Sequence, residues 1–274
     1  MQGIKAFIPT EEKVAYLQML VNCGFHTLDI GSFVSQKAIP QMKDTANVLS
    51  AINLSRTTTK LLAIIANKRG ANDALAQQKI DYLGYPFSIS ETFQMRNTHK
   101  TILESVETLQ DIIAITAEAK KELVVYVSMG FGNPYGEPWN PKIVSNWVRK
   151  LVDMGVRIIS LSDTVGTSTP ETITHLFETL IPQYPNITFG AHLHTTPSTW
   201  FEKINAAYQA GCRRFDGAIQ GLGGCPMAND ELVGNMPTEK IISYFTSQKA
   251  NHNIDVFRFE ATYNAASRLF GKYH

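Results

Sequence analysis

The sequence predicts an α/β fold: a (β/α)₈ TIM barrel that lacks its first strand and carries extra C-terminal helices. Apolar, β-branched segments alternate with amphipathic segments at intervals of about thirty residues, as in the βα units of a parallel sheet. Seven strands can be assigned, one fewer than a complete barrel contains. No G-x-G-x-x-G loop opens the first helix, which disfavours the alternative of an open doubly wound sheet.

The predicted elements follow one another along a single domain, residues 1–274. Short apolar runs predict strands at residues 25–33, 59–66, 80–87, 123–131, 156–164, 187–194 and 213–220. Amphipathic stretches predict helices at residues 11–23, 36–52, 71–77, 99–121, 141–154, 170–181 and 198–210, and a C-terminal helical extension (about 237–274) adds helices at 238–248 and 260–270. Two helix starts carry proline behind a capping side chain, at Asn140-Pro141 and Thr169-Pro170.

The first predicted element is the helix at residues 11–23, so the strand that opens a barrel is absent before it. We expect the chain to begin in the loop that would follow that strand. An incomplete barrel leaves strand edges unpaired at its seam, which favours association with another chain. We therefore expect a homodimer.

Composition limits the partners of the protein. Lys and Arg number 25 against 24 Asp and Glu, and no basic cluster stands out, which argues against nucleic acid or an anionic membrane. No apolar run reaches the length of a membrane span and no signal peptide is evident, so we expect a soluble cytoplasmic protein. The three cysteines are too widely spaced to indicate a disulfide framework or a cysteine zinc site.

Polar residues gather where the predicted strands end, and the C-terminal ends of the strands carry the chemistry of TIM barrels. These ends read D-I-G-S (29–32), S-M-G-F-G-N-P (128–134), S-L-S-D-T-V-G (160–166) and A-H-L-H-T (191–195). Asp29 and Ser32 are placed to support a neighbouring ligand. Asp163 has three interpretations: a proton carrier, an acceptor for a substrate hydrogen bond, or a cap of its own loop.

His192 and His194 are the strongest candidates for metal ligands. Residues two apart on a strand point to the same side, so H-x-H directs both imidazoles into the barrel mouth. Two neutral imidazoles suit a divalent transition metal such as Zn, Mn or Co. The alternative is that one histidine packs in the core and the other forms a hydrogen bond.

The run at residues 215–235, F-D-G-A-I-Q-G-L-G-G-C-P-M-A-N-D-E-L-V-G-N, presents a thiol. Three glycines within four residues precede Cys225, and they allow a close approach and free movement of the loop. Cys225 is therefore a candidate reactive group at the mouth of a pocket. Asn235 either offers an amide oxygen to a metal or forms a turn.

Together these motifs resemble the hydroxymethylglutaryl-CoA lyase family of the DRE-TIM metallolyases over essentially the whole chain. The matching motifs are G-S-F-V-S-Q-K-A-I-P-Q-M (31–42), F-S-I-S-E-T-F-Q-M-R-N (87–97), S-L-S-D-T-V-G-T-S-T-P (160–170), A-H-L-H-T and G-L-G-G-C-P. The resemblance implies an acyl-CoA substrate and cleavage of a 3-hydroxy-3-methylglutaryl thioester to acetoacetate and acetyl-CoA. It also implies a divalent cation, Mg²⁺ or Mn²⁺ first and Zn²⁺ or Co²⁺ as alternatives.

The resemblance further implies roles for individual residues. The cation ligands of the family correspond to His192, His194 and Asn235. The catalytic groups correspond to Cys225, which transfers a proton, and to Asp163 in the active site, with His192 beside them. The substrate-binding residues correspond to Gln2, Asp29 and Ser32.

The chain also departs from the family pattern. Members carry R-D-x-x-Q at the end of the first strand, where Asp binds the metal and Arg stabilises the enolate oxygen. Met1-Gln2 aligns with the last two positions of that motif, so we expect the native protein to start upstream with the missing strand. Thr195 stands where the family has Asp, and Met227 where it has Tyr.

Three functions remain open at this point: an active acyl-CoA lyase, a related lyase or aldolase for another 3-hydroxyacyl-CoA, and a non-catalytic truncated homologue that binds CoA esters or a partner.

Overall fold

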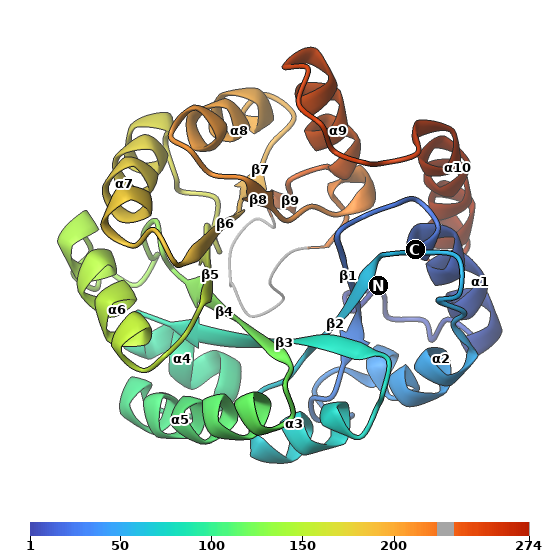
Figure 1. Ribbon diagram of the computed structural model, residues 1–274, viewed down its shortest axis with the longest axis horizontal. Helices are drawn as coiled ribbons and strands as arrows, with labels where there is room; N and C mark the ends of the chain where they lie inside the picture. Colours follow the sequence, from blue (N-terminus) through green and yellow to red (C-terminus); the bar gives the residue numbers. More distant parts are fainter. Residues whose placement is uncertain (224–232, 274) are drawn as a thin grey trace.

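In the computed structural model, which describes residues 1–223 and 233–273, seven parallel strands form one curled sheet inside a ring of helices (Figure 1). The strands are hydrogen-bonded in the order β1 (Thr27–Ser32), β2 (Lys60–Ile64), β3 (Ile80–Ser88), β4 (Glu122–Ser128), β5 (Ile158–Ser162), β6 (Thr188–His192) and β8 (Arg214–Phe215). The predicted seven-stranded parallel barrel is confirmed. Within the described residues, β1 and β8 are its two outer strands.

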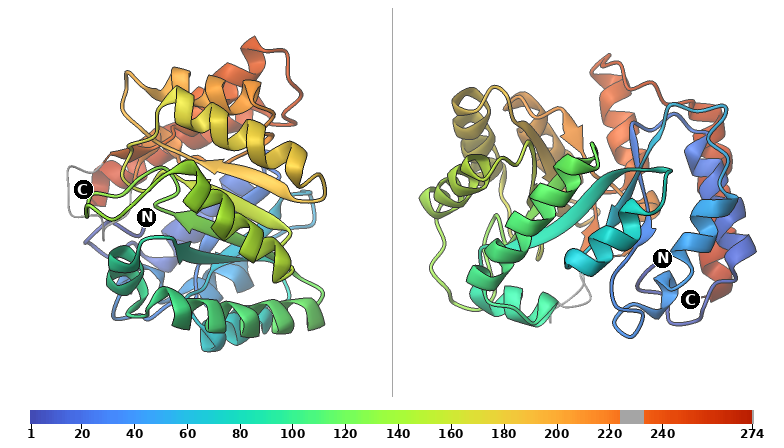
Figure 2. Two further views of the ribbon diagram at one scale, coloured as in Figure 1. Left: turned by 90° about the vertical axis from the view of Figure 1, so that its left-hand side faces the viewer. Right: turned by 60° about the horizontal axis from the view of Figure 1, so that its bottom comes forward.

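The helices lie outside the sheet and connect its strands (Figure 2). They are α1 (Thr10–Val21), α2 (Thr45–Ala51), α3 (Lys68–Leu75), α4 (Glu91–Thr98), α5 (Ile102–Glu118), α6 (Pro141–Asp153), α7 (Pro170–Gln183), α8 (Trp200–Gln209), α9 (Thr238–Ser247) and α10 (Val256–Tyr273). The caps predicted for α6 and α7 are present, because the side chains of Asn140 and Thr169 accept from the amides of Ile143 and Thr172. None of the described helices is long and apolar enough to cross a membrane.

Two predicted elements need correction, and one helix was missed. The predicted helix 36–52 is α-helical only from Thr45, since Pro40 cannot donate a backbone hydrogen bond and starts a short 3₁₀ turn instead. Helix α4 was missed although Ser90 caps it by accepting from the amide of Phe93 at 3.1 Å. The predicted strand 187–194 stops at His192, and a separate strand β7 (His194–Thr195) pairs antiparallel with β9 (Gly234–Asn235).

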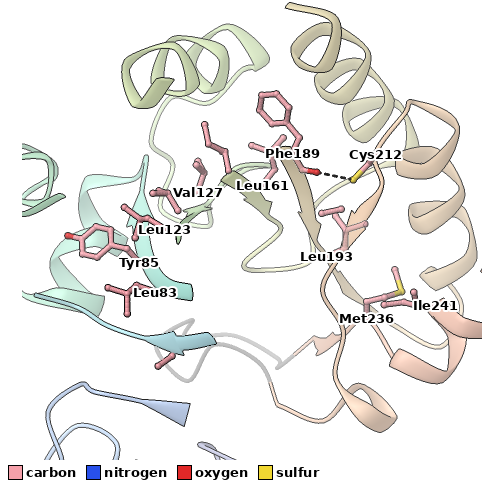
Figure 3. Packing of buried hydrophobic residues seen from close by; sticks show 14 of the residues in the cluster. Leu83, Tyr85, Leu123, Val127, Leu161, Phe189, Leu193, Cys212, Met236 and Ile241 are labelled. Carbon is pink, nitrogen blue, oxygen red and sulfur yellow. Dashed lines mark hydrogen bonds between the residues drawn. The ribbon is translucent and has the colours of Figure 1, made fainter. Parts of the chain in front are cut away.

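Side chains alternate between the two sides of each strand. On β3, Leu83 and Tyr85 face the helices and join the main core, together with Leu161 of β5 and Phe189 of β6 (Figure 3). The inside of the barrel holds a much smaller apolar cluster of Leu62, Val124 and Ile158, flanked by Ile64, Tyr82 and Tyr126. The interior is tightly packed at this level, because a Cβ on Gly84 would lie 2.6 Å from the side chain of Ile64 on the adjacent strand β2. Polar groups at the C-terminal ends of the strands lie beyond this cluster.

Candidate functional site

His192 is the last residue of β6 and is about one-third exposed. Its ring lies 5.7 Å from the His194 ring, centroid to centroid, and meets the edge of Tyr126 at 5.6 Å. Its Nδ1 atom lies 3.3 Å from Oδ2 of Asp216. The two histidines are therefore together, as predicted, although a break between β6 and β7 replaces the single strand expected to carry both.

Asn235 joins this pair through the backbone. In the β7–β9 ladder Asn235 lies directly opposite His194. The Nδ2 atom of Asn235 donates to the carbonyl of Leu222 at 3.1 Å, which fixes the amide and leaves Oδ1 as its acceptor. Two imidazoles and one amide oxygen, predicted from distant segments, are brought into one region of the barrel mouth.

His194 is almost completely buried. Burial, reinforced by the neighbouring His192, lowers the pKa of His194 to about 4. The ring is therefore neutral at physiological pH, which is the protonation state that binds a metal.

This donor set suits a divalent cation, since neutral imidazole and amide oxygen are both metal ligands. The three donors bring no negative charge of their own. Among residues 1–223 and 233–273, no three or more His, Cys, Asp or Glu side chains form a group that could hold a metal ion. The metal assignment of His192, His194 and Asn235 thus stays a prediction, supported by their proximity.

Asp216 was missed in the sequence although it follows β8 directly. Its Oδ2 accepts from Ser160 Oγ at 3.0 Å and contacts His192 Nδ1. Burial alone would raise the pKa of Asp216, but the hydrogen bond and charge of His192, with Arg214, hold the pKa below its usual value. The rule that placed the other polar residues at strand ends applies equally here and would have found it.

Asp29 points into the barrel from β1. More than a third of its surface is accessible, yet protein surrounds the carboxyl group, and this desolvation raises the pKa of Asp29 to about 6. Its Oδ1 accepts from the amide of Gly31 at 3.1 Å. A carboxyl group with this pKa can both take up and release a proton near neutral pH.

The other two predicted substrate-binding residues differ in their surroundings. Ser32 is buried at the end of β1, and within the described part of the chain its hydroxyl has no hydrogen-bond partner. Such an orphaned hydroxyl is available to a ligand. Gln2 is exposed in the segment that precedes α1 and makes no hydrogen bond to the described residues.

Asp163 is completely buried directly after β5. Its two carboxylate oxygens accept from the amide of Ser168 at 3.0 Å, from the Ser168 hydroxyl, and from Nζ of Lys203 at 2.8 Å. These contacts are those of the loop cap, one of the three interpretations of Asp163. Its catalytic role stays a prediction. Cys225, the predicted thiol, lies outside the described residues.

The chain is similar to known proteins in sequence and in fold. A family model described as HMGL-like matches residues 1–265. A hydroxymethylglutaryl-CoA lyase of Bacillus subtilis is 30% identical over 93% of this chain and 84% of its own length. The structure of an HMG-CoA lyase from Brucella melitensis superposes with a TM-score of 0.90 at 29% identity, covering 98% of this chain and 94% of that one. The structure of an HMG-CoA lyase from Acinetobacter baumannii, in complex with coenzyme A and 3-methylmalate, superposes with a TM-score of 0.90 at 27% identity. The match covers 98% of this chain and 87% of that one.

Proposed function

The chain belongs to the HMGL-like family of carbon–carbon lyases, and from this we propose that it cleaves a 3-hydroxy-3-methylglutaryl thioester to acetoacetate and acetyl-CoA. The observation that carries the proposal is the meeting of His192, His194 and Asn235 at the barrel mouth. We propose that these three residues hold a divalent cation, Mg²⁺ or Mn²⁺ first. When bound, that cation supplies Lewis-acid polarisation of the substrate oxygens.

The reaction moves one proton at each of two points. The proton of the tertiary hydroxyl leaves as the C–C bond breaks and the C–O bond becomes the ketone of acetoacetate. The electron pair of the broken bond remains on the methylene of the acetyl thioester as an enolate, which then takes up a proton. A residue that can carry a proton must therefore lie beside each of these two positions.

Asp29 suits the first of these steps. Its raised pKa, about 6, makes the carboxylate a stronger base than an ordinary aspartate while it stays largely ionised at neutral pH. For the second step we retain Cys225 as the donor, on the resemblance of G-L-G-G-C-P to the family motif. Ser32, whose hydroxyl is buried and orphaned within the described residues, is proposed to bind the substrate together with Gln2.

The test is a thioester cleavage assay of the full chain with added Mg²⁺ or Mn²⁺, which follows acetoacetate release. We expect cleavage that stops when the cation is chelated. His192→Asn should lower kcat/KM by more than the roughly 10- to 100-fold typical of an outer-shell partner of a metal. His175→Asn, on the exposed side of α7, is the matched control and should behave as the wild type.

Two outcomes would change the conclusion. Cleavage of a 3-hydroxyacyl-CoA with a longer acyl group in preference to the 3-methyl substrate would assign the related lyase activity instead. An absence of cleavage with every thioester, in the presence of either cation, would support the non-catalytic alternative.

A further inference from the structure

We propose that Asp216 is a positioning residue that fixes the tautomer and the orientation of the His192 ring for cation binding. The inference deepens the proposed function and rests on its cation site. Asp216 is assigned no contact with substrate or cation, and it acts only through His192.

Asp216 is itself held in place by two neighbouring strands. Its backbone amide donates to the carbonyl of Ala191 on β6 at 3.1 Å, directly before His192. Its Oδ2 accepts from Ser160 Oγ on β5 at 3.0 Å. The carboxylate therefore sits on a rigid part of the sheet, at a fixed height relative to the histidine.

The contact with His192 dictates which ring nitrogen carries hydrogen. A carboxylate oxygen accepts hydrogen bonds, and Oδ2 of Asp216 already accepts from Ser160 Oγ, so Nδ1 of His192 is the donor across the 3.3 Å contact. Nε2 of a neutral ring is then left with its lone pair, on the side away from Asp216.

Neighbouring rings limit how His192 can turn. The ring centroid of Tyr126 lies 5.6 Å from that of His192 at an interplanar angle of 78°, and the centroid of His194 lies 5.7 Å away at 52°. With Asp216 on a third side, these contacts restrict the His192 ring to one favoured orientation. Carboxylate partners of this kind raise metal affinity roughly 10- to 100-fold.

The substitution Asp216→Asn tests this directly, because it preserves size and removes the charge. An amide can donate to Nδ1, so the His192 ring is free to place its hydrogen on Nε2. Nitrogen-15 NMR of the histidine rings, in metal-free protein at about pH 8, should show Nδ1–H for His192 in the wild type and a shift towards Nε2–H in the variant. Mn²⁺ titrated without substrate should bind roughly 10- to 100-fold more weakly to the variant.

Asp81→Asn is the matched control, since Asp81 is also a partly exposed strand aspartate but accepts from the Leu61 amide, away from the histidines. It should leave the tautomer and the Mn²⁺ affinity unchanged. Ser160→Ala removes the hydrogen bond from the Ser160 hydroxyl to Asp216. This variant keeps the Asp216 carboxylate, so it should weaken Mn²⁺ binding less than Asp216→Asn does.

The inference is overturned if wild-type His192 carries its hydrogen on Nε2, if the wild type binds no Mn²⁺, or if Asp216→Asn binds Mn²⁺ as tightly as the wild type. Neither readout uses a thioester. A wild type that shows Nδ1–H and binds Mn²⁺ but cleaves no thioester therefore contradicts the proposed function and leaves the role of Asp216 standing.

Discussion

Lys203 shows how much one buried side chain can organise. Its Nζ donates to Oδ2 of Asp163 at 2.8 Å and to the carbonyls of Gly166 and His194 at 3.0 Å each. Helix α8 is thereby joined to the loop after β5 and to the backbone of a predicted metal ligand. Both charged groups are almost completely buried, so neither can exchange its partner for water.

Lys203→Met should lower the free energy of unfolding by about 3–5 kcal/mol, because it leaves the Asp163 carboxylate buried without a cation. Urea denaturation measures the change. Lys142→Met, on the exposed side of α6, is the control and should alter the free energy of unfolding by less than about 0.5 kcal/mol. A Lys203 variant as stable as the control would show that the ion pair contributes nothing.

The sequence predicted residues at strand ends well but could not predict their partners. Asp163 was correctly expected after a strand, whereas Lys203, whose amine donates to its carboxylate, lies 40 positions later in the chain. Asp216 also follows a strand and the same rule would have found it, but its contact with His192 exists only because β8 lies beside β6. Spacing within a strand is local information, and these contacts depend on the order of strands in the sheet.

Among the elements, α10 illustrates a helix held by one face. Phe270 is buried and packs edge-on against Tyr16 of α1, with ring centroids 5.4 Å apart. Phe259 packs in the same way against Phe25 at 6.1 Å. Phe257, in the first turn of α10, is 86% exposed. The helix thus attaches to the barrel beside α1, as Figure 1 also shows.

Phe270→Ala should destabilise the protein by about 3–5 kcal/mol, because it removes a buried ring and leaves a cavity between α1 and α10. Phe257→Ala makes the same chemical change on the same helix and should stay within about 0.5 kcal/mol of the wild type. Thermal or urea denaturation compares the two. An equal loss of stability in the two variants would contradict the packing described for α10.

Elements with strong periodicity were predicted, and those that depend on distant contacts were not. The long helices α5, α6 and α7 have a continuous apolar stripe that the sequence reveals. Helix α4 buries only Phe93 and Gln94, so its eight residues carry no such stripe. Strands β7 and β9 are two residues each and exist because segments about forty residues apart pair with each other.

The free energy of unfolding of the whole molecule should depend on pH because His194 is buried as a neutral ring. Its folded-state pKa is about 4 against an ordinary value of 6.5, so between these pH values the unfolded chain binds a proton that the folded chain excludes. The free energy of unfolding therefore falls as the pH falls through this window, by up to about 3 kcal/mol from this group. In His194→Asn, the free energy of unfolding should fall less steeply between pH 7 and pH 4, as measured by denaturation at each pH. An identical decline in both proteins would contradict the burial of a neutral imidazole.

At the scale of the molecule, the alternation of apolar and amphipathic segments was enough to predict the barrel, because each βα unit repeats the same local pattern. The homodimer stays a prediction, which a sedimentation measurement would test. The convergence of His192, His194 and Asn235 was predicted only through the resemblance to the family. The place of Asp216 beside His192 was not predicted, since the two residues come from different segments.

The hydrogen bond between Asn235 and Leu222 determines which changes of sequence this part of the protein can accept. The side chain of Asn235 bonds to the carbonyl of Leu222, and Gly234 approaches Gly221 so closely that a Cβ on Gly234 would lie 2.9 Å from the Gly221 oxygen. The chain positions on either side of residues 224–232 are thus tied together at their base. Doubling the length of a connection whose ends are already fixed costs only about 0.6 kcal/mol in loop entropy. An insertion between Leu222 and Asn235 should accordingly leave the Asn235 amide where the barrel holds it, whereas a side chain at position 234 would displace it.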